Sequence, residues 1–136
     1  MTDNQLVEII SDMGKPLTYI IRHGATPEAT TFLTPPEFKQ QVGFIVYPAG
    51  GEVKRHVHRQ LERHLVGTSE VLYMLRGHAL IDIYNDEHQL VDTRELFPGD
   101  LMLMVGGGHG FRMLENTTFL EIKQGPYEGI DEKEQF

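Results

Sequence analysis

The sequence predicts an all-β domain, and three observations lead to this expectation. Apolar, β-branched and aromatic residues occur in short runs, and turn-forming residues such as Gly, Pro and Asn separate these runs. No segment carries a sustained apolar repeat of roughly 3.6 residues, which a long amphipathic helix requires. The length of 136 residues corresponds to one ordinary domain.

Residues 1–39 are expected to hold strands and loops that pack on the rest of the fold. Residues 6–10 predict either a short helix or an edge strand, which the Gly14-Lys15-Pro16 sequence ends. Residues 17–22 are rich in β-branched and aromatic side chains, which favour a strand. Residues 24–36 contain three prolines and four threonines, so we expect loop there with at most one short strand.

From residue 40 onward the pattern is one of short strands divided by turns. The first two predicted strands are residues 42–47 and 53–58, separated by the Pro48-Ala49-Gly50-Gly51 turn. The later predicted strands are residues 70–75, 79–84, 89–96, 101–105, 111–114 and 119–123. Such regular spacing is typical of a β-sandwich or β-barrel. The polar residues 124–136 are expected to form a tail across the surface of this fold or of a neighbouring subunit.

Composition and charge exclude several classes of function. The chain has no cysteine, which excludes disulfides, thiolate metal ligands and cysteine nucleophiles. This composition agrees with a reducing compartment, so we expect a cytoplasmic protein without a signal peptide. No apolar stretch approaches the roughly 18 residues that a membrane helix requires, so no membrane partner is expected. The net charge of -8 argues against nucleic-acid binding, which depends on basic surface.

A pair of histidines, His56-Val57-His58, is the most informative motif. Two residues apart on a strand, they would point to one face and provide half of a first-row metal site. An apolar run from Glu70 to Gly77 can add a carboxylate at the head of another strand. A Pro98-Gly99-Asp100 turn then leads through an apolar strand to His109. Imidazoles with one carboxylate suit Fe, Mn, Ni, Co, Cu or Zn, and the ligand types do not select among these ions.

With these motifs the chain resembles small single-domain proteins of the cupin superfamily over residues 40–123. The resemblance implies a double-stranded β-helix, or jelly-roll, barrel in those residues, with residues 124–136 as a tail. It also implies one divalent transition metal held by His56, His58, Glu70 and His109. Cupins of this kind are commonly homodimers, so we expect a homodimer, and paired barrels would protect their exposed edge strands.

The carboxylate ligand has an alternative. Eleven residues separate His58 from Glu70, whereas the family usually places three or four between the second histidine and the glutamate. Spacing alone would therefore select Glu62. We prefer Glu70 because it begins an apolar strand, while Glu62 lies in a polar run that predicts an inserted loop.

Residues near the motif suggest ligand and acid–base roles. Basic residues cluster in this acidic chain, and they either balance acidic neighbours on a solvated loop or guide a small anionic ligand to the metal. The substrate-binding candidates among them are Lys54, Arg59 and Arg63. The candidates for acid–base catalysis are Glu62, His64 and Tyr73.

Two functions follow from the sequence. The first is a mononuclear metal enzyme that acts on a small anionic oxygenated metabolite or sugar derivative, as a dioxygenase, isomerase or decarboxylase. The second is a non-catalytic cupin that binds a small molecule or sugar as a sensor or pathway accessory. Fold resemblance does not choose between them, because one fold supports many functions.

Overall fold

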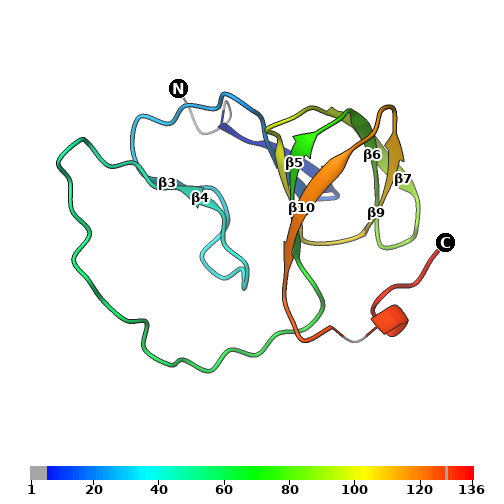
Figure 1. Cartoon of the computed structure of the whole chain (residues 1–136). Coiled ribbons are helices and arrows are strands. Elements are labelled where there is room, and N and C mark those ends of the chain that lie inside the picture. Colours follow the sequence, from blue (N-terminus) through cyan, green and yellow to red (C-terminus); the bar gives the residue numbers. More distant parts are fainter. Residues whose placement is uncertain (1–5, 128) are drawn as a thin grey trace.

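The computed structural model of the protein describes residues 6–127 and 129–136, and this part of the chain is an all-β fold (Figure 1). Apart from one 3-10 helix, η1 (Gly129–Glu132), its regular elements are strands. The strands are β1 (Glu8–Asp12), β2 (Lys15–Ile21), β3 (Thr31–Phe32), β4 (Gly43–Phe44), β5 (Glu70–Arg76), β6 (Ala79–Tyr84), β7 (Leu90–Leu96), β8 (Leu101–Met104), β9 (Gly108–Met113) and β10 (Thr118–Lys123). None of the helices among these described residues has the length and hydropathy that a membrane span requires.

The strands form three antiparallel sheets. A five-stranded sheet has the order β1-β2-β8-β5-β10, a three-stranded sheet has the order β7-β6-β9, and β3 pairs with β4. None of these sheets closes into a barrel within the described residues. The structure therefore confirms the all-β class and leaves the jelly-roll barrel as a proposal.

The main core lies between the five-stranded and three-stranded sheets. Central strand β8 is covered on both faces, which explains its continuous apolar sequence. Met102 and Met104 pack into the main core with residues of the three-stranded sheet, whereas Leu103 packs on the outer face with Tyr19 and Val71. Both methionines are core residues, since they are 0% and 3% exposed.

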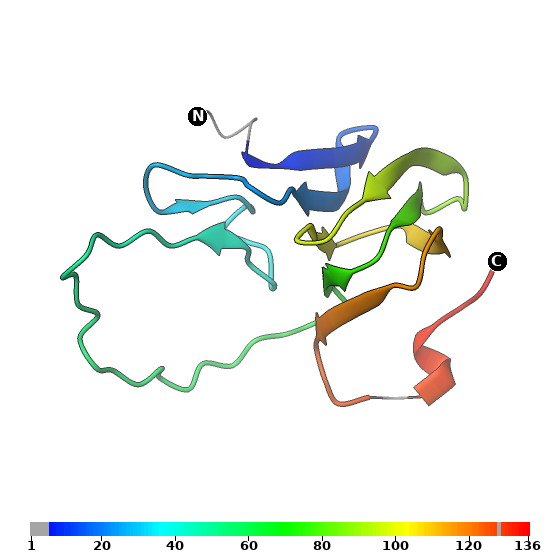
Figure 2. The same ribbon diagram turned by 45° about the horizontal axis from the view of Figure 1, so that its top comes forward.

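Most predicted strands from residue 70 onward are confirmed, and residues 6–10 contribute to an edge strand rather than a helix. Two strand predictions are wrong. Of residues 42–47 only Gly43–Phe44 form a strand, and residues 53–58 form none. Residues 45–68 are largely exposed and follow a long path away from the two large sheets, as Figures 1 and 2 show. A strand needs a neighbouring strand with which to pair, and in the described structure this segment pairs with none.

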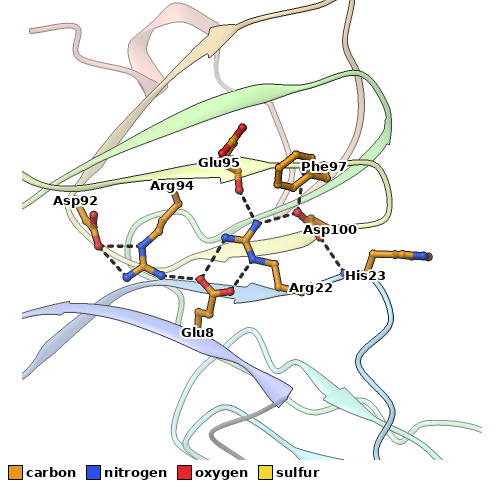
Figure 3. Close-up of polar contacts among 8 residues, drawn as sticks. All are labelled: Glu8, Arg22, His23, Asp92, Arg94, Glu95, Phe97 and Asp100. Atoms are coloured by element: carbon orange, nitrogen blue, oxygen red, sulfur yellow. Dashed lines mark hydrogen bonds and ion pairs between the residues drawn. The ribbon is translucent and has the colours of Figure 1, made fainter.

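A buried carboxylate fixes the turn between β7 and β8 (Figure 3). Asp100 is 2% exposed, and its side chain accepts hydrogen bonds from the backbone N–H groups of Phe97 and His23, each at 2.9 Å. Arg22 donates to the same carboxylate at 2.9 Å and also to Glu8 at 2.6 Å. Gly99 has a φ of +91°, and a Cβ there would lie 2.6 Å from Nδ1 of His23. The predicted Pro-Gly-Asp turn therefore ties β1 and β2 to the start of β8.

We expect Asp100→Ala to destabilise the fold by about 2–4 kcal/mol, because Arg22 and two backbone N–H groups lose a buried acceptor. The measurement is urea unfolding at neutral pH. Asp86→Ala is the matched control, since its ion pair with Lys15 is exposed and should leave the unfolding midpoint unchanged. Equal shifts in the two midpoints would contradict the assigned role of Asp100.

Candidate functional site

A cleft of about 1080 Å³ opens between β5 and β10 on one side and β9 on the other. The C-terminal segment after η1 forms a further wall, and Gly67 and Thr68 lie at its border. The lining residues with chemically active or aromatic side chains are Glu70, Tyr84, His109, Phe111, Glu121, Glu132, Lys133, Glu134 and Phe136. This volume is slightly above the range of about 300–1,000 Å³ that is typical of clefts for small ligands.

Glu70 and His109 meet across this cleft. Glu70 is the first residue of β5 and belongs to the five-stranded sheet, whereas His109 belongs to β9 of the three-stranded sheet. The distance from Nε2 of His109 to Oε1 of Glu70 is 3.9 Å, and the two side chains are 27% and 17% exposed. The structure therefore brings together two of the four predicted metal ligands.

Glycines shape the approach to His109. Gly107 has a φ of +62°, and a Cβ there would overlap the carbonyl oxygen of Tyr84. This close approach lets β9 pair with β6 from its first residue, so that His109 lies opposite Ile83. The glycine run before His109 thus has a structural role in placing the imidazole.

Burial shifts the pKa values of Glu70 and His109 in opposite directions. Burial raises the pKa of Glu70 to about 7, and a hydrogen bond to Glu121 and its negative charge add to the rise, while Lys133 and Lys123 oppose it. Burial lowers the pKa of His109, and the positive charge of Lys133 lowers it further. At neutral pH His109 is therefore a neutral imidazole, the form that binds metal ions.

The charge of the cleft favours a cation. Among the lining residues that the structure describes, four are glutamates, and Lys133 is the one lysine or arginine. Two of these carboxyl groups, on Glu70 and Glu121, share a hydrogen bond. A divalent cation would relieve the repulsion between them, whereas an anion would meet it.

His56 and His58 do not reach this cleft. They lie on the exposed segment between β4 and β5, which turns away from the sheets in both views (Figures 1 and 2). Their rings are still neighbours, with centroids 5.3 Å apart. Nδ1 of His56 lies 2.8 Å from the carbonyl oxygen of Lys54, which can only accept a hydrogen bond. In the neutral imidazole Nδ1 therefore carries the proton, and Nε2 has the lone pair that a ligand bond requires.

The donor set fits a first-row metal ion in part. Two ligands of one tetrahedral ion, each at about 2.1 Å, lie about 3.4 Å apart, so the 3.9 Å between Glu70 and His109 requires a small adjustment. In the conformation described for residues 6–127 and 129–136, no three His, Asp or Glu side chains gather into a metal-binding group. A complete site would need His56 and His58 to move.

The remaining predicted site residues lie outside the cleft. Five of them are exposed on the segment between β4 and β5: Lys54, Arg59, Glu62, Arg63 and His64. Tyr73 lies on β5, but on the face opposite to Glu70, next to the exposed Leu120 of β10. The structure thus places Glu70 and not Glu62 beside His109, and it places no predicted acid–base residue there.

Sequence reasoning missed Glu121 and Lys133. Glu121 lies two residues after Phe119 on β10, so the two side chains share one face of the strand. Because Phe119 packs on the core, this spacing was a sequence signal that Glu121 faces inward. Lys133 lies in the polar tail, where no sequence pattern indicates that it borders a cleft.

Glu70→Gln is expected to gain stability relative to wild type as the pH rises. The difference in free energy of unfolding, variant minus wild type, should be about 1–2 kcal/mol larger at pH 8 than at pH 4. Water screens part of the site, so this difference is smaller than the full pKa shift implies. The folded-state pKa of about 7 lies above the ordinary value of 4.5, so folded Glu70 holds its proton more tightly than unfolded Glu70. Its contribution to stability is complete below pH 4.5 and is lost as the pH rises through 7. Gln cannot ionise and escapes this loss.

The measurement is the difference in free energy of unfolding between variant and wild type across that pH range. Glu62→Gln provides the control, because the exposed Glu62 side chain should show no such pH-dependent difference. A difference for Glu70→Gln that does not change with pH would contradict the buried, hydrogen-bonded carboxyl.

Comparison with protein-family models, with curated proteins and with solved structures finds no match to this chain. The resemblance to cupins therefore rests on the sequence motifs alone.

Proposed function

We propose that the protein binds one divalent first-row transition metal, with Glu70 and His109 as the ligands already in place. The observation that carries the proposal is the 3.9 Å approach of Nε2 of His109 to Oε1 of Glu70 in an acidic, partly buried cleft. The neutral imidazole and the carboxylate are a typical ligand pair for Zn, Fe, Mn, Ni, Co or Cu.

His56 and His58 complete the ligand set when the segment between β4 and β5 folds onto the sheets. Segments of this length without regular structure are uncommon in compact domains. Its end, at Gly67 and Thr68, already borders the cleft, and apolar side chains such as Val57 are exposed along it. Metal binding commonly drives such ordering, because the ligand bonds offset the entropy of the free segment. Closure in this way would complete a jelly-roll barrel.

The bound metal would supply Lewis-acid or redox chemistry to a small anionic oxygenated metabolite or sugar derivative. The protein side chains would provide the positive charge that binds this anionic ligand. Glutamates line the cleft, so an anion gains little there without added positive charge. Lys54, Arg59 and Arg63 travel with the closing segment and would supply that charge at the rim. A dioxygenase, isomerase or decarboxylase reaction is compatible with this arrangement.

A second candidate is a non-catalytic cupin that binds a small molecule or sugar as a sensor or pathway accessory. One observation favours it: Glu62 and His64 lie on the exposed segment and Tyr73 faces away from Glu70, so none of the predicted acid–base groups stands beside His109. A metal-loaded protein that binds carboxylates reversibly and converts none of them would support this candidate.

Metal content tests the main proposal directly. Elemental analysis of untagged protein should give about one transition-metal ion per chain. In calorimetric titrations with Zn²⁺, His109→Ala and Glu70→Gln should weaken binding by about 100-fold or more, since each removes a ligand. Glu62→Gln and His78→Ala are the controls and should bind as wild type does. Zn²⁺ binding that is equal in all five proteins would overturn the site.

The same titration tests closure of the segment. His56→Ala and His58→Ala should also weaken Zn²⁺ binding, because each removes an imidazole ligand. Wild-type affinity in both variants, with loss in His109→Ala, would show that the cleft binds metal without the segment.

We also propose that the protein is a homodimer that pairs through its exposed sheet edge. Strand β10 is an edge strand of the five-stranded sheet, and Leu120 and Ile122 on its outer face are 52% and 56% exposed. Light scattering at micromolar concentration should give twice the chain mass. Ile122→Lys should give monomers, because it places a charge on β10, the edge strand through which the chains are proposed to pair. Ile9→Lys places the charge on β1 and should leave the dimer intact. A monomeric wild-type protein would contradict the proposal.

A further inference from the structure

The C-terminal segment reaches the three-stranded sheet through one aromatic side chain. The ring of Phe136 stacks on that of His88, with centroids 4.2 Å apart and planes 14° from parallel. The ring of Tyr84 meets it edge-on at 5.0 Å. Although Phe136 is 61% exposed, one face and one edge of its ring are thus in contact with the sheet.

The surface that receives Phe136 is held in place by the turn between β6 and β7. His88 has a φ of +65°, and its N–H donates to the carbonyl oxygen of Asn85 at 3.1 Å. The buried Asn85 side chain accepts hydrogen bonds from the N–H groups of Glu87 and Gln89. These bonds fix the orientation of the turn, so the His88 ring offers a preformed stacking surface.

Gly108 provides the space beside this surface. A Cβ at Gly108 would lie 2.9 Å from Cε1 of Phe136, closer than a real Cβ contact allows. Its backbone is not in the left-handed region, so the lack of a side chain matters here for space and not for conformation. The residue next to the candidate ligand His109 therefore accommodates the ring of Phe136.

From Glu132, the last residue of η1, the segment lines the cleft with Glu132, Lys133, Glu134 and Gln135 before it reaches Phe136. Glu132 also meets Lys123 of β10 at 3.5 Å, so the segment contacts both large sheets. Lys133 is the one lysine or arginine among the described lining residues.

We propose that Phe136 is a positioning residue that holds residues 132–136 as a wall of the cleft, so that this wall limits access to His109. The wall sets both the size of the entrance and its charge, because Lys133 belongs to it. This inference rests on the proposed function for the importance of His109, but the contact itself requires no metal.

The reactivity of His109 toward diethylpyrocarbonate, followed residue by residue by mass spectrometry on metal-free protein, tests this inference. The pH should be above the ordinary imidazole pKa, so that reactivity reports access and not protonation. Phe136→Ala removes the ring, and Gly108→Ala would displace it, because the added Cβ would lie 2.9 Å from Cε1 of Phe136. Each variant should therefore speed modification of His109 by about three- to tenfold. Modification of the exposed His56 and His58 should be unchanged and serves as the internal reference.

Two further variants define the controls. Phe136→Tyr keeps the ring and should react as wild type does, whereas a merely destabilised chain would not be rescued in this way. Phe32→Ala removes an exposed ring on β3, away from the cleft-lining residues, and should leave His109 unchanged. Unchanged His109 reactivity in both Phe136→Ala and Gly108→Ala would overturn the inference, and so would an equal rise at all histidines, which would indicate general unfolding. Failure of metal binding would not affect this assay, so the two proposals fail separately.

Discussion

The ion pair between Arg22 and Asp100 is the interaction on which the arrangement of the two large sheets depends (Figure 3). A nearly fully buried carboxylate is costly unless it is paired and hydrogen-bonded, and Asp100 is compensated by one guanidinium and two backbone N–H groups. Arg22 continues the network to Glu8, which also binds Arg94 at 2.6 Å. Glu8 of β1, Arg22 directly after β2 and the turn between β7 and β8 thereby meet at one place. These contacts help to fix the position of β8.

The position of β8 in turn determines the cleft. Strand β8 pairs with β5 on one side and with β2 on the other, so it sets the register that places Glu70 opposite Met104. The chain then turns at Gly107 into β9, which belongs to the other sheet and carries His109. Strand β8 positions β5 and so Glu70, and the next strand, β9, carries His109 in the other sheet. The turn between β8 and β9 therefore brings Glu70 and His109 together. Their partial burial follows from this geometry, and the shift in the pKa of Glu70 follows from the burial and from Glu121.

The sequence predicted the part of the fold in which local pattern and tertiary pairing agree. Strand β6 was predicted with the bounds that the structure has, because alternating burial and flanking turns coincide there. Residues 53–58 show the limit of this reasoning, since alternation indicates which side chains share a face but not whether a neighbouring strand exists. For the site, Glu70 and His109 could be predicted from motifs. The parity of β10 indicated only which way Glu121 faces, and nothing in the sequence indicated Phe136, because the roles of both arise from contacts between segments that are distant in sequence.

Charge gives a physical reason for the exposed segment to approach the cleft. The chain is acidic as a whole, yet between β4 and β5 basic side chains outnumber acidic ones, with Lys54, Arg55, Arg59 and Arg63 among them. The cleft, in contrast, is lined mainly by glutamates. Complementary charge of this kind favours contact and steers it. Without a metal ion, the basic side chains of the segment would form ion pairs with the glutamates, and none would remain to bind an anionic ligand. The proposed divalent cation on Glu70 and His109 would change this balance, because it would offset the carboxylates and free the arginines. In the proposed function, metal and segment would therefore be complementary parts of one electrostatic arrangement, in which the ion would make the cleft suitable for an anion.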